Sequence, residues 1–209
     1  MRHESALEQH SPAIVAILRG IRPDEAVEVG KSLVDAGIRI VEVPLNSPEP
    51  LESIQHLAQS IGRVALVGAG TVLTTAAVDD AAAAGAKFIV SPNCVPAVIA
   101  RTRELNLESM PGVLSPTEAI AAVAAGARHL KLFPAASLWQ GHMRALLDVL
   151  PGDCRLWAVG GVTAGNALQW AEHGAFGVGV GSALYRPGTS VSEIRREAGE
   201  LVEVWQNRR

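Results

Sequence analysis

Residues 116–133 have the sequence PTEAIAAVAAGARHLKLF, one full copy of the pattern that decides the fold. Pro116 suits the first turn of a helix, and the pair Ala125-Gly126 marks its end. Glycine there permits the left-handed conformation that turns the chain toward the next element. Residues 129–133 then form an almost continuous apolar run, as expected for a parallel strand buried on both faces.

The same pattern recurs along the chain. Helices are predicted to begin near Pro23, Pro48, Thr74, Val95, Pro116, Ser137 and Thr163. Strands are predicted at 14–18, 38–43, 64–68, 88–91, 108–112, 129–133, 155–159 and 177–181, of which the fifth has the weakest pattern. Eight strands with centres roughly 20 to 27 residues apart are typical of a compact (β/α)8 barrel.

A doubly wound α/β sheet is the competing fold. It usually has fewer strands and a glycine-rich fingerprint after the first strand. Here the first predicted strand is followed by RGIR at 19–22, which lacks that fingerprint. We therefore expect a single-domain (β/α)8 TIM barrel over 13–209, preceded by an N-terminal arm or short helix over 1–12.

Composition narrows the function classes. The 209 residues include 18 basic and 21 acidic side chains, and the net charge of −3 argues against nucleic acid or an anionic membrane as a general partner. The chain has no apolar run of the ~18 residues that a membrane span needs, and its first residues lack the apolar core of a signal peptide. The two cysteines match no zinc or redox spacing. A cytoplasmic enzyme is expected.

Lys131 is the sharpest chemical signal, because it lies inside the apolar run HLKLFP at 129–134. Burial disfavours an ammonium group and makes the amine available as a nucleophile toward a carbonyl. The alternative is a lysine at a strand end that reaches solvent or pairs with a carboxylate. Glu42 is the matching acid, a single charge in IVEVP at 40–44. It could move protons between substrate and water, or form a structural ion pair with Lys131 or Arg19.

The ends of the last two predicted strands indicate a phosphate site. Gly160 and Gly161 follow the seventh strand, and Gly181 and Ser182 follow the eighth. In this fold, backbone N–H groups of these loops usually bind phosphate, although glycines also serve tight turns. Arg19 and Thr71 end two other strands and could bind a carboxylate or carbonyl; a rim salt bridge is the alternative for Arg19.

The histidines and cysteines carry less information. His129 shares a strand face with Lys131 and is expected to pack in a lower layer of the barrel. No spacing of histidines and carboxylates suggests a metal site. Cys94 is expected near the barrel mouth, without a histidine at a telling spacing.

Several motifs together resemble the class I aldolases of the KDPG/KHG family, which act on 2-keto-3-deoxy-6-phospho sugar acids. The resemblance covers residues 14 to about 188. Its motifs are AILRG (16–20), VEVPLNSP (41–48), GAGTVL (68–73), SPN (91–93), LKLFPA (130–135), AVGGV (158–162) and GVGS (179–182).

The resemblance implies a homotrimer of metal-independent barrels with no cofactor. Lys131 corresponds to the family's Schiff-base lysine and Glu42 to its proton-shuttling glutamate. Thr71 matches the threonine that contacts the pyruvate part, and Arg19 matches a substrate-binding arginine. Gly160, Gly161, Gly181 and Ser182 match the phosphate-binding backbone.

Two departures place the chain beside the galactonate-type branch of this family. Gluconate-type members have EVTLRT at the glutamate strand and threonine before the glycine pair, whereas this chain has EVPLNS at 42–47 and Val159. The expected reaction is reversible cleavage of 2-dehydro-3-deoxy-6-phospho-D-galactonate to pyruvate and D-glyceraldehyde 3-phosphate. The alternatives are the gluconate epimer or both epimers, a phosphosugar isomerase or epimerase, and a phosphosugar-binding barrel without catalysis.

Overall fold

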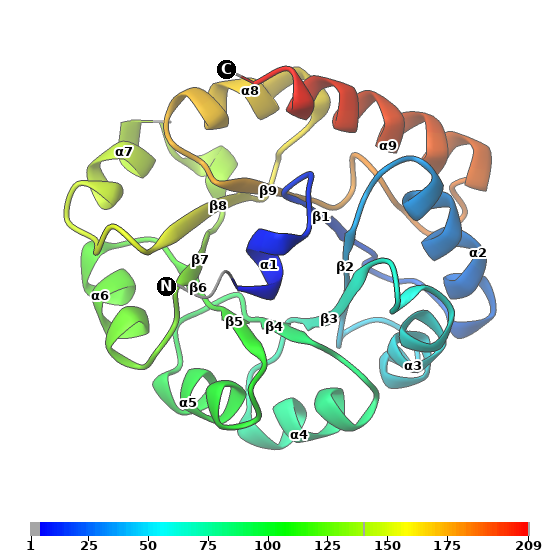
Figure 1. Ribbon diagram of the computed structural model, residues 1–209, viewed down its shortest axis with the longest axis horizontal. Helices are drawn as coiled ribbons and strands as arrows, with labels where there is room; N and C mark the ends of the chain where they lie inside the picture. Colours follow the sequence, from blue (N-terminus) through cyan, green and yellow to red (C-terminus); the bar gives the residue numbers. More distant parts are fainter. Residues whose placement is uncertain (1–4, 140, 209) are drawn as a thin grey trace.

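The computed structural model describes residues 5–139 and 141–208, and these form a closed parallel barrel surrounded by helices (Figure 1). The strands are β1 (Ile14–Ile17), β2 (Ile40–Pro44), β3 (Leu66–Gly70), β4 (Phe88–Val90), β5 (Glu108–Met110), β6 (Gly112–Val113), β7 (His129–Leu132), β8 (Arg155–Val159) and β9 (Gly177–Val180). Their order in the sheet is β5-β4-β3-β2-β1-β9-β8-β7-β6, and each paired neighbour is parallel. The expected (β/α)8 barrel is confirmed.

The fifth predicted strand, 108–112, is wrong as one continuous strand. Pro111 divides it into β5, which pairs with β4, and β6, which pairs with β7. Proline has no N–H to donate to a ladder, but its carbonyl still accepts a hydrogen bond from the Lys131 N–H at 2.9 Å. Pro111 thus joins the two ends of the sheet. The other seven predicted strands overlap the observed ones, with ends displaced by at most two residues.

The helices that follow the strands are α2 (Pro23–Asp35), α3 (Pro50–Ile61), α4 (Thr75–Ala83), α5 (Pro96–Glu104), α6 (Pro116–Ala124), α7 (Gly141–Leu147), α8 (Ala164–Glu172) and α9 (Val191–Gln206). Gly37, Gly85 and Gly126 end three of them with φ between 101° and 107°, as the Ala-Gly pairs predict. Figure 1 shows the helices as an outer ring around the strands. No helix in the described residues is long and apolar enough to cross a membrane.

One predicted helix start is wrong. The helix expected near Pro48 does form and begins at Pro50, because Glu49 has φ 41° and cannot be part of a right-handed helix. The helix expected near Ser137 is only a 3-10 turn, η1 (Ala135–Ser137), after which Leu138 is extended. The true helix, α7, begins at Gly141. The last helix, α9, was not among the predicted starts.

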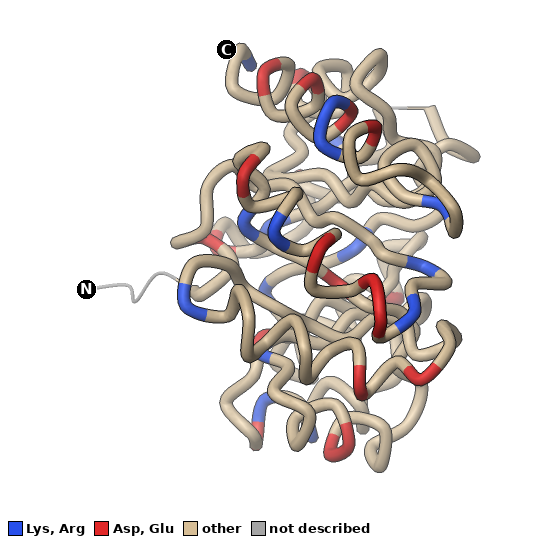
Figure 2. Tube along the Cα trace, turned by 90° about the vertical axis from the view of Figure 1, so that its right-hand side faces the viewer, with Lys and Arg blue, Asp and Glu red and all other residues tan. Residues whose placement is uncertain are grey.

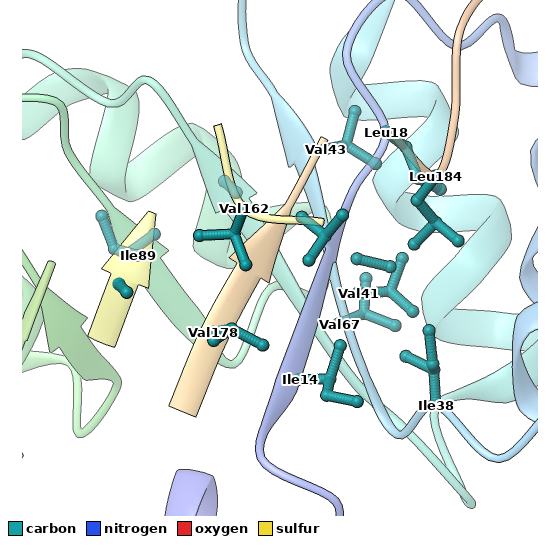
Figure 3. Packing of buried hydrophobic residues seen from close by; sticks show 14 of the residues in the cluster. Ile14, Leu18, Ile38, Val41, Val43, Val67, Ile89, Val162, Val178 and Leu184 are labelled. Carbon is teal, nitrogen blue, oxygen red and sulfur yellow. The ribbon is translucent and has the colours of Figure 1, made fainter. Parts of the chain in front are cut away.

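Side chains alternate along each strand between two hydrophobic layers. Val41, Val43 and Val67 belong to the outer layer between the sheet and the helices, part of which is drawn in Figure 3. Ile40 and Trp157 belong to the inner layer, which fills the barrel. The register of β2 therefore turns Glu42 toward the barrel interior, on the same side as Ile40.

A short helix, α1 (Ala6–Gln9), closes one end of the barrel (Figure 1). Its Leu7 is fully buried in the inner layer. Ser5 Oγ lies 2.7 Å from His129 Nε2, and Glu8 pairs with Arg155 at 2.9 Å. Both partners are the first residues of their strands, so α1 covers the end where the strands begin. Residues 1–4 of the expected N-terminal arm lie outside the described residues.

Candidate active site

The residues predicted to carry the chemistry come from six consecutive strands of the barrel. In the order β3-β2-β1-β9-β8-β7, these strands carry or precede Thr71, Glu42, Arg19, the pair Gly181-Ser182, the pair Gly160-Gly161, and Lys131. Each residue lies near or just past the end of its strand, opposite α1. In parallel barrels this end is where substrates bind. The structure thus brings the predicted residues to one mouth.

Lys131 and Glu42 are both buried, with 4% and 2% of their surface exposed. Burial lowers the pKa of the Lys131 amine, the negative charge of Glu42 partly raises it again, and Arg19 lowers it further. Burial also raises the pKa of the Glu42 carboxyl, and the charges of Lys131 and Arg19 oppose that rise. The charge of each group therefore acts on the pKa of the other, and burial makes the charged form of both groups less favourable.

Two neighbouring residues, Phe133 and Gly70, shape the surroundings of these side chains. The Lys131 Nζ lies 4.6 Å from the centre of the Phe133 ring. A side chain at Gly70 would overlap the Glu42 carboxyl, so only glycine leaves room for the observed position of that carboxyl. Phe133 was not predicted as a site residue, because an aromatic in an apolar strand normally indicates a core position.

Arg19 and Thr71 lie at the rim of the mouth. Arg19 is exposed and donates a hydrogen bond from Nη1 to Asn46 Oδ1 at 2.7 Å. It belongs to none of the ion pairs found between described residues, so its guanidinium is held by a neutral amide. Thr71 has φ 56°, a conformation that is costly for a side chain other than glycine. Such strain is typical of functional sites.

The two glycine loops lie side by side, because β8 and β9 are neighbours. Gly160 and Gly161 have φ of 96° and 76°, and Asn166 Nδ2 donates to the Gly161 carbonyl at 2.9 Å. After β9 the chain forms a single turn in which the Gly181 carbonyl accepts hydrogen bonds from two later N–H groups. Within the described residues, the N–H groups of Gly161 and Ser182 donate to no acceptor of the chain. Such free donors suit an anion.

The opposite end of the barrel has a groove of about 670 Å³ beside α1. The charged side chains that line it form ion pairs with one another. Its arginines pair with neighbouring carboxylates, as in Arg128–Asp153 at 3.1 Å and Arg155–Glu8 at 2.9 Å. His129 lies here as expected, with 1% of its surface exposed, and accepts a hydrogen bond from Trp157 Nε1 at 3.0 Å. Among the described residues, no group of three histidine, cysteine or carboxylate side chains could hold a metal ion.

Comparison with known proteins shows the family of the chain. The family model "KDPG and KHG aldolase" matches residues 6–196. The chain belongs to the KDPG and KHG aldolase family. The family is one of carbon–carbon lyases, so an aldolase replaces the isomerase and binding-protein alternatives.

Two members of this family are close relatives. The chain is 46% identical over 185 residues to a probable 2-dehydro-3-deoxy-6-phosphogalactonate aldolase of Rhizobium meliloti (strain 1021), covering 88% of this chain and 87% of the relative. It is 43% identical over 193 residues to the 2-dehydro-3-deoxy-6-phosphogalactonate aldolase of Escherichia coli (strain K12), covering 92% and 94%. A solved structure described as native KDPGal is 42% identical, with a TM-score of 0.92 and coverage of 99% and 98%.

Proposed function

We propose that this chain is a class I aldolase that reversibly cleaves 2-dehydro-3-deoxy-6-phospho-D-galactonate to pyruvate and D-glyceraldehyde 3-phosphate. The observation that carries the proposal is the buried pair Lys131 and Glu42 at the barrel mouth, in a chain whose two close relatives bear this substrate in their names. An amine of lowered pKa together with a carboxyl of raised pKa suits the formation of an imine. An isomerase or epimerase would instead use a pair of carboxyl groups as acid and base.

The first half of the reaction is formation of the imine. The neutral Lys131 amine attacks the C2 ketone and gives a carbinolamine. Glu42 moves one proton from nitrogen to the carbinolamine oxygen and passes on a second proton taken up from solvent, so that this oxygen leaves as water. The product is an iminium whose positive charge stands next to C3. Because the iminium accepts electrons, the reaction needs no other electron sink.

The second half breaks the C3–C4 bond. The Glu42 carboxylate takes the proton of the C4 hydroxyl, and the electron pair of the C3–C4 bond flows into the iminium. Glyceraldehyde 3-phosphate leaves as the aldehyde, and an enamine stays on Lys131. Glu42 returns the proton to C3, after which water hydrolyses the pyruvate iminium and frees the amine. One water is released and one consumed, and the proton taken up in the first half returns to solvent when the amine is freed.

The free N–H groups of the glycine loops are proposed to bind the phosphate. Gly160, Gly161, Gly181 and Ser182 form this site, at the edge of the mouth next to β1 and Arg19. Arg19 is proposed to bind the substrate carboxylate, and Thr71 the pyruvate part. Binding energy from the distant phosphate would orient the C3–C4 bond for cleavage.

Preference for the galactonate epimer is proposed to come from β2, which carries Glu42, with the residues after it, and from the end of β8. Asn46 and Val159 replace an arginine and a threonine of gluconate-type members, and Val159 is buried beside Gly160. These changes alter the contacts to the carboxylate and to the C4 hydroxyl, where the two sugars differ. A site built to hydrogen-bond one epimer can reject the other strongly.

Cleavage of both epimers, measured as pyruvate production, tests the proposed function. We expect a higher kcat/KM for the galactonate epimer than for the gluconate epimer. In Val159→Thr we expect a smaller ratio between these two kcat/KM values. Equal rates for both epimers would overturn the specificity but leave the aldolase chemistry. No pyruvate from either epimer would overturn the proposed function.

We also propose that the enzyme is a homotrimer, as the family resemblance implies. Ile120 and Trp139, with 55% and 73% of their surface exposed, are apolar side chains that a partner copy could cover. Light scattering on the purified protein is expected to give three copies of the 21.9 kDa chain. A mass of one chain would contradict the trimer.

A further inference from the structure

Tyr185 is the single tyrosine of the chain, and it joins two loops of the barrel mouth. It is buried, with 2% of its surface exposed. Its hydroxyl donates a hydrogen bond to Glu25 Oε1 at 3.0 Å. Glu25 lies in the first turn of α2, directly after the loop that carries Arg19. Tyr185 itself belongs to the loop after β9, which carries Gly181 and Ser182.

The backbone of Tyr185 closes the turn that presents the free N–H of Ser182. Its N–H donates to the Gly181 carbonyl at 2.9 Å, next to the equivalent bond from Leu184 at 2.8 Å. One end of the residue therefore shapes the proposed phosphate-binding turn, and the other end is attached to α2. A displacement of the tyrosine would move the turn with it.

The acceptor at the other end is held firmly. The same Oε1 of Glu25 accepts the Arg22 N–H at 3.2 Å, and the Glu25 N–H donates to the Arg22 carbonyl at 3.3 Å at the start of α2. The two loops also touch a second time, where the Pro187 ring packs against the side-chain-free face of Gly20. Gly20 in turn donates its N–H to Ser47 Oγ at 2.9 Å, which links this loop to the one that carries Asn46.

We propose that the Tyr185–Glu25 hydrogen bond is a positioning device for the phosphate end of the substrate. It fixes the turn at Gly181 and Ser182 relative to Arg19, and so sets the distance between the groups that receive the two anionic ends of the substrate. The inference rests on the proposed function, because it takes that turn as the phosphate site. Tyr185 touches no reacting atom, so it should affect binding of phosphorylated ligands and spare the chemistry at Lys131.

The test compares Tyr185→Phe, Glu25→Ala and Glu25→Gln in the full-length protein. Three quantities are measured: KM and kcat for the phosphorylated substrate, the inhibition constant of inorganic phosphate, and the exchange of the C3 protons of pyruvate with deuterium. The last reaction uses Lys131 and Glu42 but no phosphate. Thr102→Val is the matched control, because it removes a different buried hydroxyl, one that bonds the Val98 carbonyl inside α5.

We expect Tyr185→Phe and Glu25→Ala to raise KM and the phosphate inhibition constant about tenfold, the usual effect of one hydrogen bond to a charged group. Pyruvate exchange should stay within about twofold of wild type, as a group acting only on binding predicts. Glu25→Gln keeps an acceptor oxygen and should restore most of the affinity. Thr102→Val should change none of the three quantities.

Two results would overturn the inference. One is an equal loss of cleavage and pyruvate exchange in Tyr185→Phe, which indicates general damage to the barrel. The other is an unchanged phosphate inhibition constant. Failure of the proposed function looks different, because the wild type would then produce no pyruvate from the phosphorylated sugar acid, whatever the variants do.

Discussion

Lys131 and Glu42 show how one environment prepares two groups with opposite charge preferences. Both side chains leave water, and burial disfavours the charged form of each. The charge of each group opposes the effect of burial on the other. Proton transfer between a substrate and a carboxyl is fastest when the pKa of the carboxyl lies near the working pH. The raised pKa of Glu42 moves the carboxyl in that direction.

The role of Glu42 predicts a dependence of the rate on pH. The reactive forms are the Glu42 carboxylate and the neutral amine of Lys131. Because the pKa of Glu42 is raised, its carboxylate is lost as pH falls through a value above the ordinary range of glutamate. We expect kcat/KM to fall on the acid side from that pH. Glu42→Gln should lower kcat by about 10²- to 10⁴-fold and remove this contribution to the profile. An unchanged rate in the variant would rule out the proton shuttle.

Gly70 gives a second prediction for a single residue. In Gly70→Ala the new methyl group would overlap the Glu42 carboxyl, so that carboxyl must move. We expect kcat to fall by at least about tenfold, because a misplacement near 1 Å has effects of this size. Pyruvate should still be trapped on Lys131 in the variant. Circular dichroism and the melting temperature check that the barrel is retained, and full activity in a folded variant would contradict the argument.

Among the secondary-structure elements, the short helix α1 covers the end of the barrel where the strands begin, and its N-cap Ser5 contacts His129. The His129 Nδ1 accepts the N–H of Trp157, so Nε2 carries the ring proton and donates it to Ser5 Oγ. Burial lowers the pKa of His129 to about 4, from an ordinary value of 6.5. Glu8 opposes the shift, and Arg155 adds to it.

This shift predicts that stability depends on pH. The unfolded chain takes up a proton at His129 below pH 6.5, but the folded protein does so only near pH 4. The free energy of unfolding should therefore fall by up to about 3 kcal/mol as pH decreases through that window. His129→Gln keeps an acceptor for Trp157 but does not titrate. Urea unfolding at several pH values should give a shallower dependence in the variant, and parallel dependences would contradict the assignment.

Over the whole chain, the repeated pattern of helix, Ala-Gly pair and apolar run was enough to predict the barrel. Its failures have local causes. Pro111 interrupts a strand without breaking the barrel, since its carbonyl still bonds the Lys131 N–H. The segment before α7 contains good helix formers, but it makes only the 3-10 turn η1, because Leu138 is extended and ends the turn.

The site was predicted less completely. Charged residues inside apolar strands are conspicuous, so Lys131 and Glu42 stood out in the sequence. Phe133 and Tyr185 were missed as site residues, because Phe133 follows an apolar strand, where an aromatic normally indicates the core, and nothing in the sequence around Tyr185 marks it out. Their roles depend on contacts with Lys131 Nζ and Glu25 Oε1, and the latter is 160 residues away along the chain.

The central claim is that Lys131 forms an imine with the substrate ketone. The most direct test is to treat the protein with pyruvate and borohydride, then to measure the intact mass and map the modified peptide, in the wild type and in Lys131→Ala. We predict one reduced pyruvyl group on Lys131 of the wild type and none in the variant. An unmodified wild type, or an adduct that persists in the variant, would contradict the imine mechanism.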